Sequence, residues 1–280
     1  MNKFTIIVLA IVFCLTTSIA WSKTDEVLVP KTLILEARKS EETYRLINSL
    51  FTQGGNAIEV SDCSHPQFGP HITQNFDKNL KKYVFRFHIH RDHDSDRCKL
   101  FGRQRTEIKV YDKSPDWLKA RKQSKFIYKW KFKLDEKFQS SRYFTHLFQV
   151  KAVGGLYFKH PVITFTTRKG LAGQEDKFEL RYGTKHKSEN ILVAQLSPFL
   201  GKWLQVVFEA TFAEKGRLFV KITSLENGTE LLSYKNTSIK IWKDESKYLR
   251  PKWGVYRSLK DKSMLRDEII DFADIEIQAN

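Results

Sequence analysis

The segment KWGVYRS, residues 252–258, places Lys252, Gly254 and Tyr256 at every second position of a predicted strand. Side chains alternate between the two faces of a β-strand, so these three residues share one face, and none of them is a bulky apolar residue. A cation and a phenol on one face can bind an anion and carry a proton. Glycine in a strand more often marks a β-bulge, however, and tyrosine more often packs in the core, so the packing interpretation stays open.

The segment RQRTEIK, residues 103–109, places four charged residues on one strand face: Arg103, Arg105, Glu107 and Lys109. Burying unpaired charges is costly, so this face must line solvent or a polar groove. The simplest role for Glu107 is to hold Arg105 in place through an ion pair.

Three histidines are further candidates for proton transfer. His88 and His90 share a strand face with Arg86. They would be candidate bases if that face joined a groove, and solvated side chains if it were the outer surface. His71 lies in a predicted loop, where binding residues are common.

The segment HIHRDHDSD, residues 88–96, also contains residue types that bind metals. Its aspartates at 92, 94 and 96 lack the glycine and the closing glutamate of an EF-hand loop, because Arg97 and Arg103 stand at those positions. A charged solvent loop is therefore the preferred interpretation. We predict no metal site and no cofactor, with a calcium or zinc site in this segment, or a structural calcium ion, as the alternative.

Residues 1–20 have the pattern of a secretory signal peptide, with one early lysine, an apolar run and small residues at the end. The apolar run is shorter than the roughly 20 residues of a membrane-spanning helix, so an uncleaved anchor is the weaker alternative. No later segment is long and apolar enough to span a membrane. We expect a secreted or periplasmic chain in which residues 21–280 form one domain. In that oxidising environment Cys63 and Cys98 are a natural disulfide pair.

The formal net charge of +16 predicts an anionic partner. Nucleic acids, membrane surfaces and acidic polysaccharides all fit this charge. A secreted protein meets acidic polysaccharides more often, and the sequence contains no recognised nucleic-acid-binding module. We expect an anionic polysaccharide as the partner, no nucleic acid, and a monomeric chain.

The elements that must position these residues are mostly strands. One helical pattern, SEETYRLINSLF, begins at Ser40 with glutamates at 41 and 42 in its first turn. From about residue 83 onward, apolar residues recur with a period of two in segments separated by clusters of Gly, Pro, Asn, Asp and Lys. Many strands, almost no helix and no βαβ rhythm predict an antiparallel sandwich of two sheets. The expected strands are 83–90, 103–111, 128–135, 143–153, 161–168, 178–182, 191–196, 203–212, 217–224, 230–235, 252–259 and 270–278.

Three of these strands resemble one family. RTEIK at 105–109 resembles the R-(T/S)-E-(L/V)-R strand of the jelly-roll alginate lyases, KWGVY at 252–256 resembles their K-A-G-V-Y strand, and QVK at 149–151 stands where they have Q-(I/V)-H. The order along the chain also agrees. Glucuronan lyases and heparin lyases share the same concanavalin-like sandwich, and these motifs do not separate them. The resemblance implies an all-β jelly roll with a short N-terminal helix, whose concave sheet cleaves a uronate-containing polysaccharide by β-elimination.

By matching position, the resemblance places Arg105, Gln149 and Tyr256 around the cleaved linkage. Arg105 and Gln149 would neutralise the uronate carboxylate, because arginine can bind a carboxylate through two oxygens and the amide adds a donor. Tyr256 would carry a proton, helped by cations that favour its phenolate, and Gly254 would leave room for a sugar ring. The other predicted substrate-binding residues are Lys252, Arg103, Glu107, Lys109, His90 and Arg257.

Lys151 stands where the family has a histidine, which leaves the identity of the general base open. The candidates are Lys151 itself and four histidines that could substitute, namely His71, His88, His90 and His146, which stands three residues before Gln149. By strict alternation His146 lies on the opposite strand face from Gln149, which counts against its sharing a groove with that residue.

Two other classes of function remain open. A glycoside hydrolase needs two carboxylates that flank the linkage, and the closest candidates, Asp267, Glu268 and Asp271, do not alternate cleanly on a strand. A non-catalytic carbohydrate-binding protein would stack exposed aromatic residues on sugars. The candidates for that role are Trp117, Trp203, Trp242 and Trp253.

Overall fold

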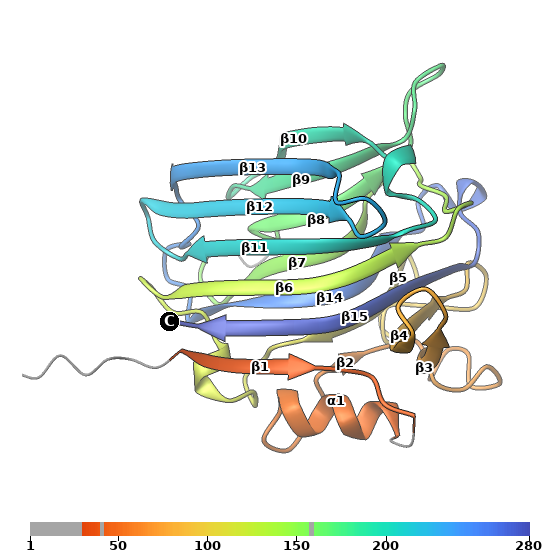
Figure 1. The fold of residues 1–280 in the computed structure, drawn as a ribbon, viewed down its shortest axis with the longest axis horizontal. Helices are drawn as coiled ribbons and strands as arrows, with labels where there is room; N and C mark the ends of the chain where they lie inside the picture. The colour runs from red at the N-terminus through yellow and green to blue at the C-terminus, as the bar shows by residue number, and fades with distance from the viewer. Residues whose placement is uncertain (1–29, 40–41, 157–159) are drawn as a thin grey trace, which may run out of the picture.

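The computed structural model describes residues 30–39, 42–156 and 160–280 (Figure 1). The predicted signal peptide, residues 1–20, lies outside the described residues, as do Ser40 and Glu41 at the start of the predicted helix. Within the described part of the chain, no helix is long and apolar enough to cross a membrane.

Two antiparallel sheets pack against each other, with the eight-stranded sheet in front in Figure 1, which confirms the predicted jelly-roll sandwich. The eight-stranded sheet has the order β13-β12-β11-β6-β15-β4-β3, with β1 paired to β15. Its strands are β1 (Lys31–Leu35), β3 (Ile72–Asp77), β4 (Lys82–Ile89), β6 (Lys125–Leu134), β11 (Trp203–Thr211), β12 (Gly216–Ser224), β13 (Glu230–Ile239) and β15 (Glu268–Ala279).

The seven-stranded sheet has the order β10-β9-β8-β7-β14-β5-β2. Its strands are β2 (Ile58–Glu59), β5 (Arg103–Lys109), β7 (Thr145–Val153), β8 (Ile163–Arg168), β9 (Lys177–Gly183), β10 (Ser188–Gln195) and β14 (Tyr248–Ser258). Short 3₁₀ helices lie in three connections: η1 (Asp116–Leu118), η2 (Ser197–Phe199) and η3 (Lys262–Met264).

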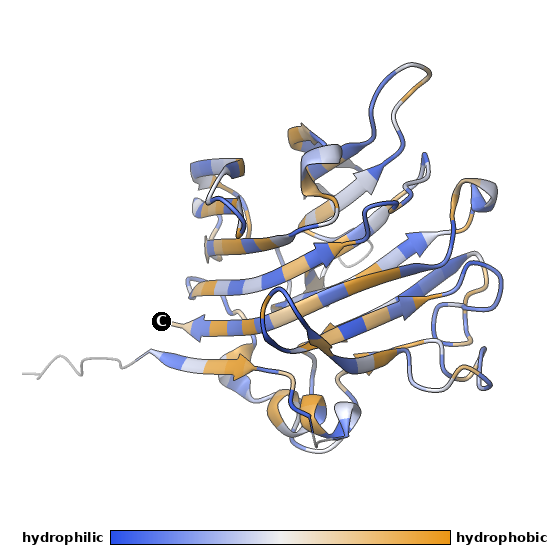
Figure 2. Cartoon of the chain, turned by 45° about the vertical axis from the view of Figure 1, so that its right-hand side comes forward, coloured by the Kyte–Doolittle hydropathy of each residue, from blue (hydrophilic) through white to orange (hydrophobic). Residues whose placement is uncertain are grey.

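Strand β6 shows how the alternating sequence forms this architecture. Its outward positions include Lys129, which forms an ion pair with Glu276 of β15 at 3.1 Å. Figure 2 shows the same alternation of hydrophobic and hydrophilic residues along several strands. Burying each large apolar side chain contributes roughly 1.5–3 kcal/mol to the free energy of folding. The alternating pattern therefore determines which face of the strand packs against the core. The inward residues of β6 are all at most 3% exposed: Phe126, Tyr128, Trp130, Phe132 and Leu134.

Aromatic residues from both sheets meet in the core. Trp130 of β6 stacks on Phe148 of β7 with ring centroids 4.5 Å apart, and it meets Trp253 of β14 edge to face at 6.2 Å. These contacts hold β7 and β14 firmly against the opposite sheet. The side chains on the outer faces of β7 and β14 are therefore held by strands whose positions are fixed by the core.

The predicted helix is confirmed as α1 (Thr43–Phe51). Glu42 caps it, because its carboxylate accepts hydrogen bonds from the backbone amides of Tyr44 and Arg45 at 2.9 and 2.7 Å. Phe51, at the other end, is buried and meets Trp253 edge to face at 6.2 Å. The helix thus covers one end of the aromatic core.

Strands β1, β2 and β3 were not expected from the sequence. β2 has only two residues, and β1 and β3 each pair with one neighbouring strand only. A strand at the margin of a sheet buries less of its surface, so its apolar alternation is weak and the period-two signal is lost.

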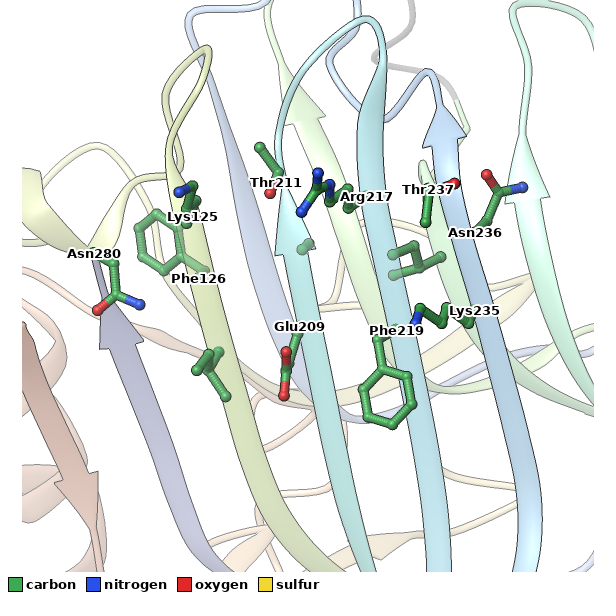
Figure 3. A pocket seen from close by; sticks show the side chains of 13 residues that line it. Lys125, Phe126, Glu209, Thr211, Arg217, Phe219, Lys235, Asn236, Thr237 and Asn280 are labelled. Atoms are coloured by element: carbon green, nitrogen blue, oxygen red, sulfur yellow. The ribbon is translucent and has the colours of Figure 1, made fainter.

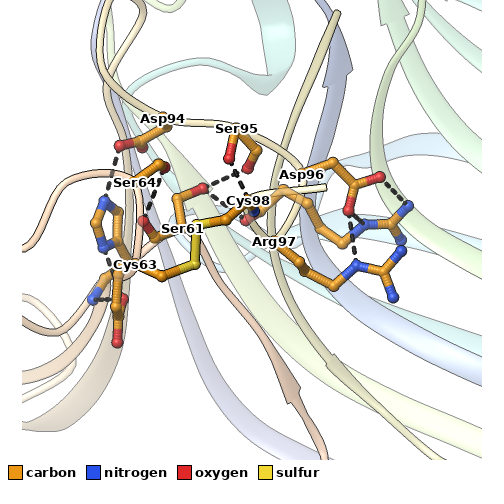
Figure 4. The surroundings of a disulfide bond; sticks show 11 residues. Ser61, Cys63, Ser64, Asp94, Ser95, Asp96, Arg97 and Cys98 are labelled. Atoms are coloured by element: carbon orange, nitrogen blue, oxygen red, sulfur yellow. Dashed lines mark hydrogen bonds and ion pairs between the residues drawn. A yellow bond between two sulfur atoms is a disulfide. The ribbon is translucent and has the colours of Figure 1, made fainter. Parts of the chain in front are cut away.

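The predicted disulfide between Cys63 and Cys98 is confirmed (Figure 4). It joins the segment after β2 to the loop between β4 and β5. The loop between β4 and β5 also carries Asp96, which accepts a hydrogen bond from Arg105 of β5 at 2.8 Å.

Candidate functional site

Strands β5, β14 and β7 are neighbours and bring the three motif segments together. Tyr256 pairs with Arg105 across β14 and β5, and Lys252 pairs with Gln149 across β14 and β7. The alternate residues of these strands, such as Phe148 and Trp253, belong to the core between the sheets. Arg105, Gln149 and Tyr256 therefore share the outer face of the seven-stranded sheet.

Glu107 lies at the centre of a buried ionic network on this face. Its carboxylate accepts hydrogen bonds from Arg105 and Lys252, both at 2.5 Å, and from the side-chain amide of Gln149. Glu107 is only 1% exposed. The network therefore fixes three side chains from three strands relative to one another, and Glu107 has the supporting position that its strand pattern suggested.

Lys252 is directed into this network rather than toward solvent. Its ammonium group also donates to Glu59 of β2 at 2.5 Å, and Lys109 donates to the other oxygen of Glu59 at 2.9 Å. Burial alone would raise the pKa of Glu59, but the charges of Lys252, Arg105 and Lys109 hold that pKa well below its usual value. Lys252 is only 2% exposed, so its contacts make it a positioning residue instead of a group that reaches a bound sugar.

Arg105 is also engaged by protein carboxylates. Its guanidinium donates to both oxygens of Asp96, at 2.8 and 3.1 Å, in addition to its bonds with Glu107 and Glu59. Its central carbon lies 3.7 Å from the centre of the Tyr256 ring. Arg105 thus supports the tyrosine from one side, and few of its donors remain for a substrate carboxylate.

Tyr256 stands between two arginines. Its phenol oxygen accepts a hydrogen bond from Arg103 at 2.7 Å, while Arg105 covers the ring. Phe144 and His146 lie beside the ring, with centroid distances of 5.0 and 6.0 Å. Because Arg103 already donates to the oxygen, the phenol hydrogen is available to another acceptor.

A pocket of about 280 Å³ opens beside Tyr256 on the outer face of the sheet. Four of its lining residues carry positive charge: Arg103, Lys151, Arg168 and Arg181. None of the described residues that line it is Asp or Glu. The pocket therefore suits an anionic sugar unit, because its cations attract a carboxylate and no acidic side chain on the described wall repels one.

Within the described chain, the four cations differ in their partners. Arg168 and Arg181 both donate to Glu179, at 3.1 and 2.6 Å. Arg103 and Lys151 form no ion pair with a carboxylate among the described residues. These two are the cations best placed to bind an incoming carboxylate.

His146 lines this pocket together with Gln149, so the prediction from strict alternation was wrong. The pairing of β7 with β8 shifts between His146 and Phe148, and Leu147 is the extra residue. Such a β-bulge changes which face the following residues take, and it turns His146 to the face of Gln149. Sequence alternation alone could not reveal this, because the bulge exists only in the pairing between strands.

The environment keeps the imidazole of His146 uncharged. Burial, reinforced by the positive charges of Arg168 and Arg181, holds the pKa of His146 well below its usual range. Its Nδ1 lies 2.8 Å from the hydroxyl of Thr166. In the tautomer in which Nδ1 donates to Thr166, Nε2 has a free lone pair and can accept a proton.

Gly254 has its own structural role at the matching irregularity of β14. The pairing of β14 with β7 shifts between Trp253 and Tyr256, and Gly254 has a φ of 136°. A Cβ atom at this position would lie 2.1 Å from the carbonyl oxygen of Thr106. Strand pairing therefore requires glycine here, which agrees with the β-bulge interpretation of the segment KWGVYRS.

Lys151 occupies the wall of the pocket one pleat beyond Gln149. Burial, followed by the nearby charges of Lys252 and Arg105, lowers the pKa of Lys151 to about 8. Lys151 is therefore mostly charged at neutral pH and loses its charge in mildly alkaline solution.

The other candidate histidines lie elsewhere. His88 belongs to β4 and contacts Thr73 of β3 at 3.1 Å, and burial followed by the charge of His90 lowers its pKa to about 4. His71 and His90 both lie against Asp94. None of the three histidines lines the pocket beside Tyr256.

Arg257 does not reach the predicted groove. It takes the opposite face of β14 from Tyr256 and is only 1% exposed. Its guanidinium donates to the side chain of Gln104 and to the carbonyl of Arg266, both at 2.8 Å. This placement contradicts the prediction that Arg257 binds substrate.

Of the carboxylates considered for a hydrolase, Glu268 and Asp271 belong to β15 of the other sheet, and Asp267 directly precedes that strand. Glu268 accepts from the backbone amide of Gln139 and from Arg266, at 2.8 and 2.9 Å, and Asp271 pairs with Arg86 at 2.8 Å. These acids serve local structure and do not flank the cationic pocket. The tryptophans considered for sugar stacking are mostly buried, since Trp203, Trp242 and Trp253 are at most 7% exposed.

A second hollow, of about 470 Å³, lies on the outer face of the eight-stranded sheet (Figure 3). Its polar side chains include Lys125, Glu209, Arg217 and Lys235, which come from four neighbouring strands. It is larger than the pocket beside Tyr256, but its described lining contains no histidine or tyrosine. The smaller pocket is therefore the better candidate for proton-transfer chemistry.

No protein-family model matches the sequence, and no curated protein matches it. Solved structures do show the same fold. One is the marine PL-14 alginate lyase from Aplysia kurodai, with a TM-score of 0.56 and 12% identity over 88% of this chain and 97% of that chain. A mutant of the alginate lyase Aly36B in complex with an alginate trisaccharide gives a TM-score of 0.55 and 12% identity, over 89% of this chain and 98% of that chain.

A variant of the family 7 alginate lyase A1-II′ in complex with substrate is similar as well. Its TM-score is 0.52 with 13% identity, over 80% of this chain and 91% of that chain. At these identities the similarity establishes the architecture, which is the jelly-roll sandwich found in alginate lyases.

Proposed function

We propose that this chain is a secreted lyase that cleaves a uronate-containing anionic polysaccharide by β-elimination. The observation that carries the proposal is the cationic pocket at which Tyr256, His146 and Gln149 meet. The jelly-roll fold shared with alginate lyases supports it. The disulfide between Cys63 and Cys98 agrees with an oxidising compartment outside the cytoplasm.

In the proposed reaction, the uronate carboxylate binds beside Arg103, Gln149 and Lys151. Neutralising that carboxylate makes the adjacent C5 proton more acidic and stabilises the negative charge that develops when the proton leaves. Arg105 has a different role here from the one that the sequence suggested, because its contacts make it a support for Tyr256 and Glu107.

Proton transfer is assigned to His146 and Tyr256. His146 accepts the C5 proton, the electrons of the C5–H bond form the C4–C5 double bond, and the bond from C4 to the linking oxygen breaks. Tyr256 gives its proton to that oxygen. The phenolate that remains lies beside the guanidinium groups of Arg103 and Arg105, which compensate its charge.

His146 can also supply the general base that is missing at position 151, where this chain has lysine and the alginate lyases have histidine. The histidine expected two residues after Gln149 is absent, but the bulge in the same strand presents a histidine three residues before it. Lys151 is then free to act as a cation rather than as the base.

A panel of glucuronan, alginate, heparin and related polymers tests the proposal. The purified mature protein is expected to generate the ultraviolet absorbance of a 4,5-unsaturated uronate with at least one of them. New reducing ends without that absorbance would identify a hydrolase. Binding to a polymer without any cleavage would identify a carbohydrate-binding protein.

The titration of Lys151 predicts the alkaline limb of the pH profile. We expect kcat/KM to fall as the pH rises through about 8, because deprotonation removes a positive charge that faces the anionic uronate. Lys151→Arg should retain the charge and move this limb upward by about one pH unit or more, since arginine stays protonated. Lys151→Met should lower kcat/KM by roughly 10- to 100-fold at neutral pH, the usual worth of a hydrogen bond to a charged group.

Lys125→Arg is a matched control, because Lys125 is an exposed lysine that belongs to the other hollow. It should leave the profile unchanged. If the alkaline limb of the pH profile had the same midpoint in Lys151→Arg as in the wild-type chain, the titrating group would not be Lys151.

A further inference from the structure

Three histidines and one aspartate gather at one end of the β3–β4 hairpin. They are His65, His71, His90 and Asp94, and one potential ligand atom from each lies within 4.8 Å of the others. They come from the loop after β2, the residue before β3, and the segment after β4. This cluster takes no part in the proposed lyase chemistry.

Two of the histidines have buried ring nitrogens without a hydrogen-bond partner. Nδ1 of His65 and Nδ1 of His90 are both in this state. Each lies 3.4 Å from Asp94, His65 beside Oδ1 and His90 beside Oδ2. Buried polar atoms of this kind normally have a hydrogen-bond partner or a metal ligand bond. Two such nitrogens beside one carboxylate therefore indicate a binding site for a further partner.

His71 is held in the orientation that a metal ligand requires. Its Nδ1 lies 2.7 Å from Asp62, whose other oxygen accepts a hydrogen bond from Tyr44 at 2.8 Å. Its Nε2 lies 2.9 Å from Asp94. A carboxylate on the far nitrogen of a ligating histidine fixes the ring and its tautomer, which is the common second layer of contacts around protein metal sites.

The disulfide holds the two loops of the cluster together. Cys63 lies between Asp62 and His65, and Cys98 lies four residues after Asp94. Figure 4 shows the bond with Asp94 on one side of it and Asp96 on the other. The positions of the potential ligands are therefore constrained by a covalent link and not only by loop packing.

We propose that His65, His71, His90 and Asp94 bind one Zn²⁺ ion in a closed structural site. Three imidazole nitrogens and one carboxylate oxygen form a donor set that zinc prefers, whereas calcium takes oxygen ligands. Ligand atoms around tetrahedral zinc lie about 3.4 Å apart, which follows from bonds of about 2.0–2.1 Å. His65 and His90 already lie 3.4 Å from Asp94, and the widest separation in the cluster, up to 4.8 Å, would have to close by about 1.4 Å on metal binding.

A metal-free ion pair is the competing explanation. Burial alone would lower the pKa of His71, but its hydrogen bonds to Asp62 and Asp94 raise it to about 9, so a protonated His71 between two aspartates is a stable arrangement. This explanation accounts for His71 only. It leaves Nδ1 of His65 and Nδ1 of His90, each 3.4 Å from Asp94, without a hydrogen bond.

The zinc site would support the loop that serves the pocket. Asp96, two residues after Asp94, holds Arg105 with two hydrogen bonds. The side chain of Gln104 donates to the carbonyls of His90 and Asp94, at 2.5 and 3.1 Å. The metal site does not depend on the proposed lyase activity.

Metal content and ligand geometry test the zinc site directly. The full mature chain, purified without chelator, is expected to contain about one zinc per chain by inductively coupled plasma mass spectrometry. Replacing zinc by Co²⁺ should give the intense visible absorption of tetrahedral cobalt. Removing the metal with a chelator should lower the midpoint of thermal unfolding, and adding Zn²⁺ should restore it.

His71→Ala and His90→Ala are each expected to lose the bound zinc, whereas His186→Ala should retain it. His186 is an exposed histidine between β9 and β10 and is a matched control. The test does not depend on the variants folding, because the wild-type chain is measured first. Less than about a tenth of an equivalent of zinc in the wild-type chain, both as purified and after incubation with Zn²⁺, would overturn the proposal. So would a six-coordinate cobalt spectrum, or equal loss of zinc in His186→Ala.

Discussion

Tyr256→Phe is expected to lower kcat by roughly 10²- to 10⁴-fold, the usual contribution of a positioned acid or base. Phenylalanine keeps the ring that packs against Arg105 and Phe144 but removes the oxygen that gives its proton to the leaving group. The free energy of unfolding should change by only about 1 kcal/mol, because a single hydrogen bond from Arg103 is lost. Initial rates of ultraviolet absorbance increase and thermal unfolding measure the two effects separately.

Tyr83→Phe is the matched control for this substitution. Tyr83 belongs to β4 in the other sheet and packs beside Phe76 with ring centroids 5.6 Å apart. Its replacement should leave kcat unchanged. If Tyr256→Phe instead retained most of its activity, or lost its fold, Tyr256 would be a packing residue and the proposed proton donor would be wrong.

Glu107→Gln is expected to lower the free energy of unfolding by about 3 kcal/mol. The substitution keeps the size of the side chain but removes the charge that compensates Arg105 and Lys252, both nearly inaccessible to water. Glu59 and Asp96 remain as partial partners, which places the effect at the lower end of the range for broken buried ion pairs. Urea unfolding followed by intrinsic fluorescence measures the change.

Glu276→Gln provides the comparison with a more accessible ion pair. Glu276 pairs with Lys129 at 3.1 Å on the outer face of the eight-stranded sheet. Its loss should change the free energy of unfolding by about 0.5 kcal/mol or less, since solvent screens such pairs. Equal effects of the two substitutions would show that the Glu107 network contributes no special stability.

The alternation of β5 and β14 could be predicted from the sequence, and so could the face shared by Arg105 and Tyr256. Alternation is a local property, and the strand pairing Tyr256 with Arg105 keeps a regular register through β5. The resemblance to alginate lyases added Gln149, which lies on the third strand. These residues were predictable because each stands in a long strand with a clear polar face.

The position of His146 could not be predicted in this way. An extra residue in β7 changes its face, and whether a strand contains a bulge depends on the register of its neighbours. The role of Lys252 was missed for a related reason. Its partner Glu59 belongs to a two-residue strand that has no detectable periodicity.

A calcium or zinc site was considered at residues 88–96, but the complete histidine cluster was not predicted, because its members are far apart in the sequence or belong to different elements. The pattern at residues 88–96 was compared with a calcium loop, in which all ligands come from one segment. In the structure, His65 and His71 come from another part of the chain and meet that segment across the disulfide. His65 gave no signal of its own.

The buried ionic network and the more open cationic pocket should respond differently to high ionic strength. Glu59, Glu107 and Lys252 are at most 4% exposed, so dissolved ions cannot approach them and their attraction persists at high ionic strength. The pocket cations Arg168 and Arg181 are more accessible, with side chains 28% and 13% exposed. In brine or seawater the buried ionic network would thus keep its arrangement, while the affinity of the pocket for a charged polymer decreases.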